Sequence, residues 1–359
     1  MPAFGQSPIR DIARRAKAFL NNRHERTADQ NRELKQARQQ LASKDQELAR
    51  LRAQLVRSGA GTEASSLNPE NIVWIFGSGR SGNTWLSSMM EDIKGHAVWR
   101  EPNVGFLFGY TYYVWAHEGQ RGAKNFILGR HKESWLRSIR NFVLDEARSR
   151  FPTLSDDEYL VVKEPNGSVG APLLMEALPE SRMILLVRDP RDVAASTMDA
   201  RRRGGWSYER NKKLYLEGQR IPADDDPDAF VENPANQYLR NVGNSKLAYE
   251  AHNGHKALVK YEDLRADTLS TIKHIYSSLG IPVDEGELAR VVEKHSWENI
   301  PEDKKGEGKF YRKATPEGWR EDLTPEQART VERITAPLLE ELYPDGGRSE
   351  SSSEKLPLN

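Results

Sequence analysis

Short apolar runs alternate with amphipathic helical patterns along most of the chain. The apolar runs predict strands at 72–76, 97–99, 159–163, 183–187 and 257–260. Several of these runs are apolar at successive positions, as is typical of parallel strands that are buried on both faces. Helical patterns lie between and after them, at roughly 84–94, 133–148, 170–178, 190–201, 235–252, 268–279 and 285–294. Strands that alternate with helices in this way predict a three-layer α/β domain built on a parallel sheet.

A different pattern occupies residues 24–57, which are highly charged and contain neither glycine nor proline. Leucines recur there every seven residues, at Leu34, Leu41, Leu48 and Leu55. This spacing predicts a coiled-coil helix through which two copies of the chain form a homodimer. Asn31 and Lys44 fall at positions where the pattern calls for apolar residues. A single solvated amphipathic helix therefore stays open as the alternative.

Shifts in composition divide the chain further. An N-terminal segment, 1–23, precedes the predicted coiled coil at 24–57, and a Gly- and Ser-containing linker follows at 58–69. The Gly- and Ser-rich tail at 346–359 has the composition of a disordered segment. The folded domain is therefore predicted at 70–345.

Composition narrows the classes of function. The 359 residues hold 53 Lys and Arg against 53 Asp and Glu, and this balance argues against a nucleic-acid partner, because such proteins carry a basic excess. The absence of cysteine excludes disulfides and thiolate metal sites, and we expect a cytoplasmic location. The first residues show no apolar signal-peptide core, and no run approaches the roughly 20 apolar residues of a membrane span. The eight histidines are scattered, so no metal site is expected.

A glycine-rich turn follows the first predicted strand and leads into a helix. It reads Gly77-Ser78-Gly79-Arg80-Ser81-Gly82-Asn83-Thr84. Glycines let the backbone approach an anion, and the start of a helix offers free N–H groups and the positive end of its dipole. The turn approaches the nucleotide-binding pattern G-x-x-x-x-G-K-[ST], but Asn83 replaces the lysine and the cation Arg80 lies inside the loop. A phosphate-binding loop poorly suited to ordinary ATP or GTP hydrolysis is predicted.

A second motif begins where the strand at 183–187 ends. Arg188 follows this strand, Asp189 is suited to cap the next helix, and Pro190 suits its first turn. Ser196 lies two helical turns further on. We expect Arg188 and Ser196 to converge on one phosphate, by a forked guanidinium contact and a hydroxyl contact. A salt-bridged turn without a ligand is the alternative.

A third motif lies at 310–319, where the adjacent cations Arg312 and Lys313 stand in a stretch that contains Gly and Pro. This stretch predicts a mobile lid over an anion, with an ordinary exposed loop as the alternative.

Together these motifs resemble those of the sulfotransferases that use 3′-phosphoadenosine-5′-phosphosulfate (PAPS). The 5′-phosphosulfate loop of that family, (K/R)-S-G-T-T-W or a related form, resembles Arg80-Ser81-Gly82-Asn83-Thr84-Trp85. Its 3′-phosphate motif, an Arg and a Ser eight residues apart, resembles Arg188 and Ser196. Its late F-x-R-K-G…W signature resembles Phe310, Arg312, Lys313, Ala314 and Trp319, with Ala in place of Gly. A Y-E-D-L element and a Ser-aromatic pair resemble Tyr261-Glu262-Asp263-Leu264 and Ser296-Trp297.

The resemblance implies PAPS as the sulfuryl donor, its product 3′,5′-bisphosphate (PAP), and no metal. The 5′ end of the nucleotide is expected at the residues of the loop, Arg80, Ser81, Gly82, Asn83, Thr84 and Trp85. The 3′-phosphate, which distinguishes PAPS from ATP, is expected at Arg188, Ser196, Arg312, Lys313 and Ala314. Three aromatic residues would surround the adenine or else pack as core, namely Trp85, Tyr261 and Trp297. Arg80 would neutralise the departing phosphate, and Lys163 would act near the bridging oxygen.

The resemblance also implies a general base. The cytosolic branch of the family carries a histidine in K-T-H-x-P, and the comparable stretch here, Lys163-Glu164-Pro165, has none. The branch that resembles tyrosylprotein and other Golgi enzymes places a glutamate 21 residues after the loop arginine, which is Glu101 here. Glu101 is therefore the expected base and Glu164 the alternative. Glu101 could instead merely pair with Arg100 or cap a turn.

Candidate acceptor residues follow Glu101 in the sequence. Aromatic residues crowd the segment after Glu101 and either line an acceptor site or pack as core: Phe106, Phe108, Tyr110, Tyr112, Tyr113 and Trp115. We expect the hydroxyl of a carbohydrate or glycolipid as acceptor. The rival functions are a P-loop kinase or NTPase, against which Asn83 counts, and a non-catalytic nucleotide-binding scaffold.

Overall fold

The computed structural model describes residues 67–113, 131–214, 222–313 and 315–344, together with five residues of the N-terminal segment. Contacts divide the chain into two units, Met1–Ala64 and Ser65–Asn359. The five described residues of the first unit are helical and exposed, namely Gln36, Gln40, Ser43, Lys44 and Glu47. The leucines of the heptad pattern lie outside the described residues, so the coiled coil, the homodimer and the predicted division into segments stay predictions.

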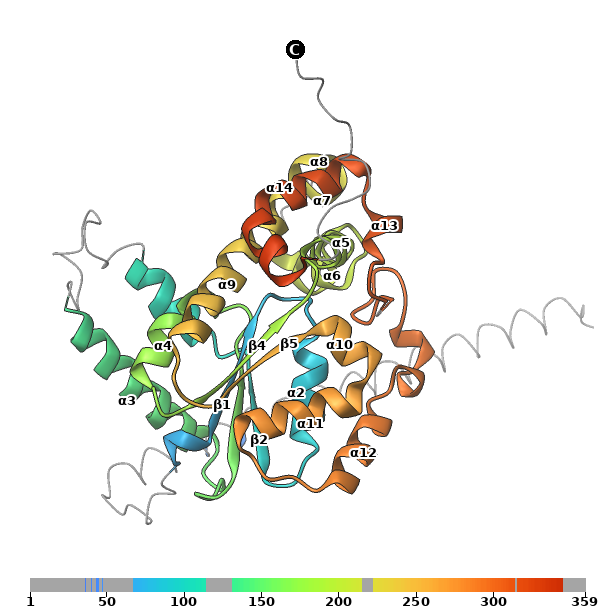
Figure 1. Ribbon diagram of the computed structural model, residues 1–359. Helices are drawn as coiled ribbons and strands as arrows, with labels where there is room; N and C mark the ends of the chain where they lie inside the picture. Colours follow the sequence, from blue (N-terminus) through green and yellow to red (C-terminus); the bar gives the residue numbers. More distant parts are fainter. Residues whose placement is uncertain are drawn as a thin grey trace, which may run out of the picture. The chain divides into compact units, whose positions relative to one another are not determined.

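A parallel five-stranded sheet with the strand order β2-β3-β1-β4-β5 forms the centre of the second unit (Figure 1). Its strands are β1 Ile72–Gly77, β2 His96–Arg100, β3 Tyr159–Lys163, β4 Arg182–Val187 and β5 Lys256–Lys260. Each predicted strand is present, and each end lies within one residue of its expected position. The predicted α/β fold is confirmed.

Helices cover both faces of this sheet (Figure 1). The α-helices are α2 Asn83–Glu91, α3 Lys132–Arg150, α4 Ala171–Ala177, α5 Pro190–Arg201, α6 Trp206–Asn211, α7 Pro222–Asp225, α8 Pro227–Phe230, α9 Glu232–Ala251, α10 Tyr261–Ala266, α11 Thr268–Leu279, α12 Glu285–Lys294, α13 Trp319–Asp322 and α14 Pro325–Leu342. Short 3₁₀ helices lie at Pro69–Asn71, Ser168–Gly170, Lys212–Leu214, Trp297–Asn299 and Glu302–Lys304, and a π-helix at Gly105–Tyr110. Among the residues that the structure describes, no helix is both long and apolar enough to span a bilayer.

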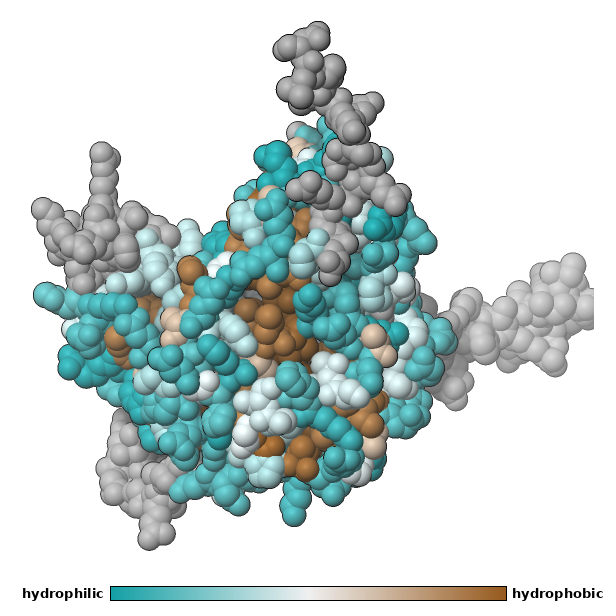
Figure 2. Space-filling view, in the orientation of Figure 1, coloured by the Kyte–Doolittle hydropathy of each residue, from teal (hydrophilic) through white to brown (hydrophobic). Residues whose placement is uncertain are grey.

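The central strand β1 explains why the sheet is covered on both sides. Successive side chains of a strand point to opposite faces, and all those of β1 are apolar up to Gly77 and buried. Trp74 and Phe76 join a core with α3, α4, α9 and α14, while Val73 and Ile75 join a second core with α2, α11 and α12. In Figure 2 apolar side chains also reach the surface over β4 and β5, where Leu258 of the edge strand is 38% exposed.

The sequence prediction lacks the short helices α6, α7, α8, α10 and α13, and also the long helix α14 and the π-helix. Helix α14 begins at a capping box in which Thr324 and Gln327 bond each other's backbone, a signal that identifies a helix start in a sequence. The π-helix follows instead from close packing, because a Cβ added to Gly105 would lie 2.0 Å from the carbonyl oxygen of Gly167. Such a contact between distant segments cannot be inferred from local pattern.

Candidate active site

A cavity of about 540 Å³, here called the donor cavity, lies where β1, β2, β3 and β4 end. The carboxyl edge of a parallel sheet is where ligands bind in folds of this kind. Most of the predicted site residues line it: Arg80, Gly82, Asn83, Thr84, Trp85, Glu101, Lys163, Arg188, Ser196, Tyr261, Trp297, Arg312 and Lys313. Ser81 is fully buried in the loop, and Ala314 lies outside the described residues.

The loop after β1 has the backbone that the phosphate-binding prediction requires. Gly82 has a φ of 89°, and a Cβ there would lie 2.7 Å from the Tyr261 ring, so only glycine fits. Helix α2 starts at the next residue, and no side chain caps it. The buried Ser81 hydroxyl has no hydrogen-bond partner among the described residues. Free backbone N–H groups, a helix dipole and a spare hydroxyl together form a site for an anion.

Asn83 supports this loop from inside. Its Nδ2 donates a hydrogen bond of 2.7 Å to the carbonyl oxygen of Ser78, and the side chain is buried. The amide group thus closes the loop where a nucleotide hydrolase has its lysine. Because the Asn83 side chain is engaged in this contact, we expect only its backbone N–H group to contact a phosphate.

The side chain of Arg80 reaches Ser196 of α5 and the segment around Phe310. Its Nε donates to Ser196 Oγ at 3.0 Å and its Nη2 to the Phe310 carbonyl oxygen at 2.9 Å. The guanidinium also lies over the rings of Trp206 and Phe310, at 5.3 and 5.1 Å from their centroids. Burial and the charge of Arg188 lower the pKa of Arg80 to about 10, so the group stays protonated at neutral pH. The structure thus joins Arg80 to Ser196, although the motifs assigned these residues to opposite ends of the nucleotide.

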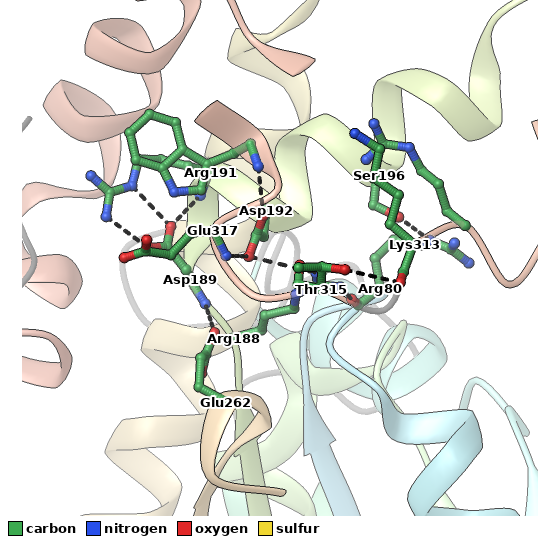
Figure 3. A network of polar contacts seen from close by, with 12 residues as sticks. Arg80, Arg188, Asp189, Arg191, Asp192, Ser196, Glu262, Lys313, Thr315 and Glu317 are labelled. Carbon is green, nitrogen blue, oxygen red and sulfur yellow. Dashed lines mark hydrogen bonds and ion pairs between the residues drawn. The ribbon is translucent and has the colours of Figure 1, made fainter. Parts of the chain in front are cut away.

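Arg188 extends from the end of β4 into the same cavity (Figure 3). Its Nη1 donates to the Arg80 carbonyl oxygen at 3.2 Å, and its guanidinium lies 4.3 Å from the centroid of the Tyr261 ring. A carboxylate oxygen of Asp192 lies 3.5 Å from Nη2. Nε is buried and has no hydrogen-bond partner among the described residues. One donor of this guanidinium is therefore left for a ligand.

The predicted lid is tied to α5 rather than loose. Asp192 accepts hydrogen bonds of 2.9 Å from the backbone N–H groups of both Glu317 and Trp319. Arg312 forms an ion pair with Asp322, and Lys313 pairs with Glu321 at 2.8 Å and with Asp322 at 3.0 Å. Both cations line the donor cavity, but carboxylates already compensate their charges.

The three aromatic residues expected around the adenine line the cavity as well. Trp85 is fixed by a hydrogen bond of 2.9 Å from its indole N–H to the carbonyl oxygen of His295. Its ring meets that of Tyr261 edge to face at 6.4 Å. Trp297 lies beneath Lys305, whose Nζ is 5.1 Å from the ring centroid.

Glu101 and Lys163 meet at the ends of adjacent strands. Lys163 Nζ lies 2.6 Å from Glu101 Oε1 and 3.2 Å from Thr84 Oγ1, at the start of α2. Asn166 donates to Glu101 Oε2 at 3.2 Å. The Glu101 side chain is 36% exposed and that of Lys163 only 4%. The alternative that Glu101 pairs with Arg100 is wrong, because Arg100 pairs with Glu91.

Glu164, the alternative base, lies elsewhere. It is fully buried and does not line the donor cavity. Its carboxylate accepts hydrogen bonds from the backbone N–H groups of Asn103, at 3.0 Å, and Gly105, at 3.2 Å. Glu101 and Asn103 both have positive φ values, 50° and 59°. Glu164 therefore holds the strained backbone that presents Glu101, and no acceptor hydroxyl has access to it.

A pH dependence of stability follows from this burial, which raises the pKa of Glu164 from 4.5 to about 7. Between these values the folded protein binds more protons than the unfolded chain, so the wild type loses stability as the pH rises through this window. Glu164→Gln removes that loss. We expect the free energy of unfolding of the wild type, relative to the variant, to fall by about 3 kcal/mol from pH 4 to pH 8. Denaturant unfolding at several pH values measures it, and a difference that is constant with pH would contradict the prediction.

Several lining residues of the donor cavity were not among the predicted site residues, and Asn166, Asp192 and Trp206 are three of them. Asn166 and Asp192 lie a few residues after the ends of β3 and β4, within motifs that the sequence analysis had singled out. Their positions could therefore have predicted that they line the cavity. Trp206 reaches Arg80 from α6, and nothing in the local pattern indicates that contact. In the described ranges no group of three or more His, Asp or Glu residues has the arrangement of a metal site.

Comparison with known proteins identifies the family. The model of the sulfotransferase domain matches residues 70–343. Carbohydrate sulfotransferase 3 of Rattus norvegicus is 34% identical over 119 residues, which cover 31% of this chain and 23% of that protein. The match thus spans less than a quarter of the relative.

A solved structure shows the same fold. A sulfotransferase from Mycobacterium avium superposes with a TM-score of 0.51 at 13% identity, covering 81% of this chain and 80% of that one. A mouse sulfotransferase complexed with PAP gives a TM-score of 0.46 at 16% identity, covering 78% and 87%.

The rat relative also corrects one prediction. It is a carbohydrate sulfotransferase, a Golgi enzyme, and this contradicts the predicted cytoplasmic location, which is wrong. That prediction rested on the absence of cysteine, which excludes disulfides but does not determine a compartment.

The family match includes every residue of the predicted site and all of the central sheet. Because it covers most of the chain, the protein belongs to the sulfotransferase family.

Proposed function

We propose that this sulfotransferase transfers a sulfuryl group from PAPS to a hydroxyl group of a carbohydrate or glycolipid, with Glu101 as general base. The contact of Glu101 with Lys163, and of Lys163 with Thr84, carries the proposal. It brings a proton acceptor and a cation to the start of α2, where the loop offers its N–H groups to an anion. Proton acceptor and leaving-group stabiliser are thus side by side.

The residues present fit a doubly phosphorylated nucleotide. The start of α2 and the unpaired Ser81 hydroxyl suit the 5′ end, and the unpaired Nε of Arg188 suits a second phosphate. We assign the 3′-phosphate to Arg188 and Ser196, with Arg80 adding positive charge beside Ser196. Arg312 and Lys313 line the same cavity and would offer N–H donors. Trp85, Tyr261 and Trp297 would enclose the adenine by stacking.

When bound, PAPS would supply the sulfuryl group and a stable leaving phosphate. Transfer of this kind proceeds in line through a loose transition state in which charge moves to the leaving group. Lys163 and the loop N–H groups are aimed where that charge grows. Glu101 accepts the proton of the acceptor hydroxyl as the new S–O bond forms.

The carbohydrate acceptor is supported by the name of a curated relative. The one curated relative named above acts on carbohydrate by its name, but it shares only a part of its length with this chain.

Thermal unfolding with PAP, with ATP and Mg²⁺, or in buffer alone tests the donor. PAP without metal at 100 times its Kd is expected to stabilise the protein by about 2.7 kcal/mol, because it binds only the folded state. Stabilisation by ATP and Mg²⁺ alone would favour a kinase, and no shift with either would favour a non-catalytic scaffold.

A further inference from the structure

A second cavity, of about 440 Å³, adjoins the donor cavity. The two cavities share the lining residues Asn166 and Gln237. Asn166 is also the residue that donates to Glu101 Oε2, at 3.2 Å. Glu101 lines the donor cavity, and its hydrogen bond with Asn166 joins its carboxylate to the wall that the two cavities share.

One wall of this second cavity is a pair of exposed aromatic rings. Phe106 and Tyr110 line it from the π-helix. Their rings are stacked, with centroids 5.2 Å apart and planes at 11°, and the two residues are 52% and 41% exposed. The glycines of this helix, Gly105 and Gly109, pack against Gly167 and Gly170. The backbone contact fixes the helix, so that the rings form a rigid apolar platform.

The other wall is polar. Asn103, Gln237 and Arg240 contribute amide and guanidinium groups, and within the described ranges the Arg240 guanidinium has no ion-pair partner. A sugar ring suits both walls, because its C–H face packs on an aromatic ring while its hydroxyl groups take up the polar donors. An aromatic alcohol would fill the apolar side and leave those donors unpaired, which costs affinity.

We propose that the second cavity is the acceptor subsite and that it holds one sugar ring of a glycan against Phe106 and Tyr110. This inference rests on the proposed function, and it names the part of the chain that selects the acceptor. Asn103, Gln237 and Arg240 bind the hydroxyl groups of the ring. The hydroxyl to be sulfated then lies toward Glu101, in line with the donor cavity.

A glycan array probed with the full-length protein, in the presence and absence of PAP, tests the subsite. Phe106→Ala is expected to weaken binding of the retained glycans by about tenfold, since a lost aromatic contact has that magnitude. Leu107→Ala is the matched control, because Leu107 is 53% exposed on the same π-helix but does not line the cavity. The control is expected to bind glycans as the wild type does. Both variants are expected to keep the wild-type affinity for PAP.

The outcomes separate this inference from the proposed function. If the wild type binds PAP but retains no glycan, or if both variants lose binding equally, the subsite proposal is overturned. Sulfation of 2-naphthol that depends on Phe106, without glycan binding, would overturn it in favour of an aromatic acceptor. If PAP does not bind while glycan binding still depends on Phe106, the donor assignment fails and the sugar subsite stands.

Discussion

Glu101→Gln is expected to abolish sulfuryl transfer while leaving the affinity for PAP nearly intact. The glutamine keeps the shape of the side chain and its contact with Asn166, but it cannot accept a proton. Loss of a general base costs about 10²- to 10⁴-fold in turnover. Glu101 does not contact the start of α2 itself but pairs with Lys163, which contacts Thr84 there at 3.2 Å. Lys163 is expected to keep this contact with Thr84 in the variant. The nucleotide site is therefore expected to survive the change.

Initial rates with PAPS and calorimetric titration with PAP measure these two quantities separately. Glu91→Gln is a matched control, because Glu91 is a nearby, partly exposed carboxylate that pairs with Arg100 and does not line the donor cavity. A Glu101→Gln protein with the wild-type rate would remove Glu101 as the base. An equal loss of rate in both variants would trace the effect to lost charge around the cavity rather than to proton transfer.

Much of this site follows from local pattern, because parallel strands bring their carboxyl ends to one edge. Arg100 of β2 pairs with Lys163 of β3 in the sheet register, so the next residue, Glu101, comes to lie beside the lysine. The glycine loop and the motif that begins with Arg188 are likewise placed by strand ends at the same edge. Here the sequence was sufficient, since register and chain direction determine the geometry.

The partners of the cations could not be predicted in this way. The contact of Arg80 with Ser196 joins residues 116 apart in the sequence, and it depends on how α5 and the segment around Phe310 pack over the loop. The same holds for Arg312, whose charge is compensated by Asp322. Side chains this long reach several neighbours, and tertiary packing decides among them. A motif therefore identifies which residues line the cavity but not which of them has a free charge.

Arg188→Ala is expected to weaken binding of PAP far more than binding of AMP. Among the cations assigned to the 3′-phosphate is Arg188, whose buried Nε has no hydrogen-bond partner among the described residues. Its ion pair with Asp192 is long, at 3.5 Å. A charge-assisted hydrogen bond is worth about 1.5–3 kcal/mol, which corresponds to a loss of roughly 10- to 100-fold in affinity for PAP. AMP has no 3′-phosphate, so its affinity is expected to change little.

Calorimetry with both nucleotides on the same protein gives this comparison an internal control. Removing Arg188 also leaves the buried carboxylate of Asp192 without its nearest cation, and burial already raises the pKa of Asp192. Some loss of thermal stability is therefore expected, but it acts on the binding of both nucleotides alike, whereas loss of a phosphate contact acts on PAP alone. Arg188→Lys, which keeps the charge but not the forked donor, is expected to recover part of the PAP affinity. Equal losses for PAP and AMP would refute the assignment of the 3′-phosphate to Arg188, and with it the distinction between PAPS and other adenine nucleotides.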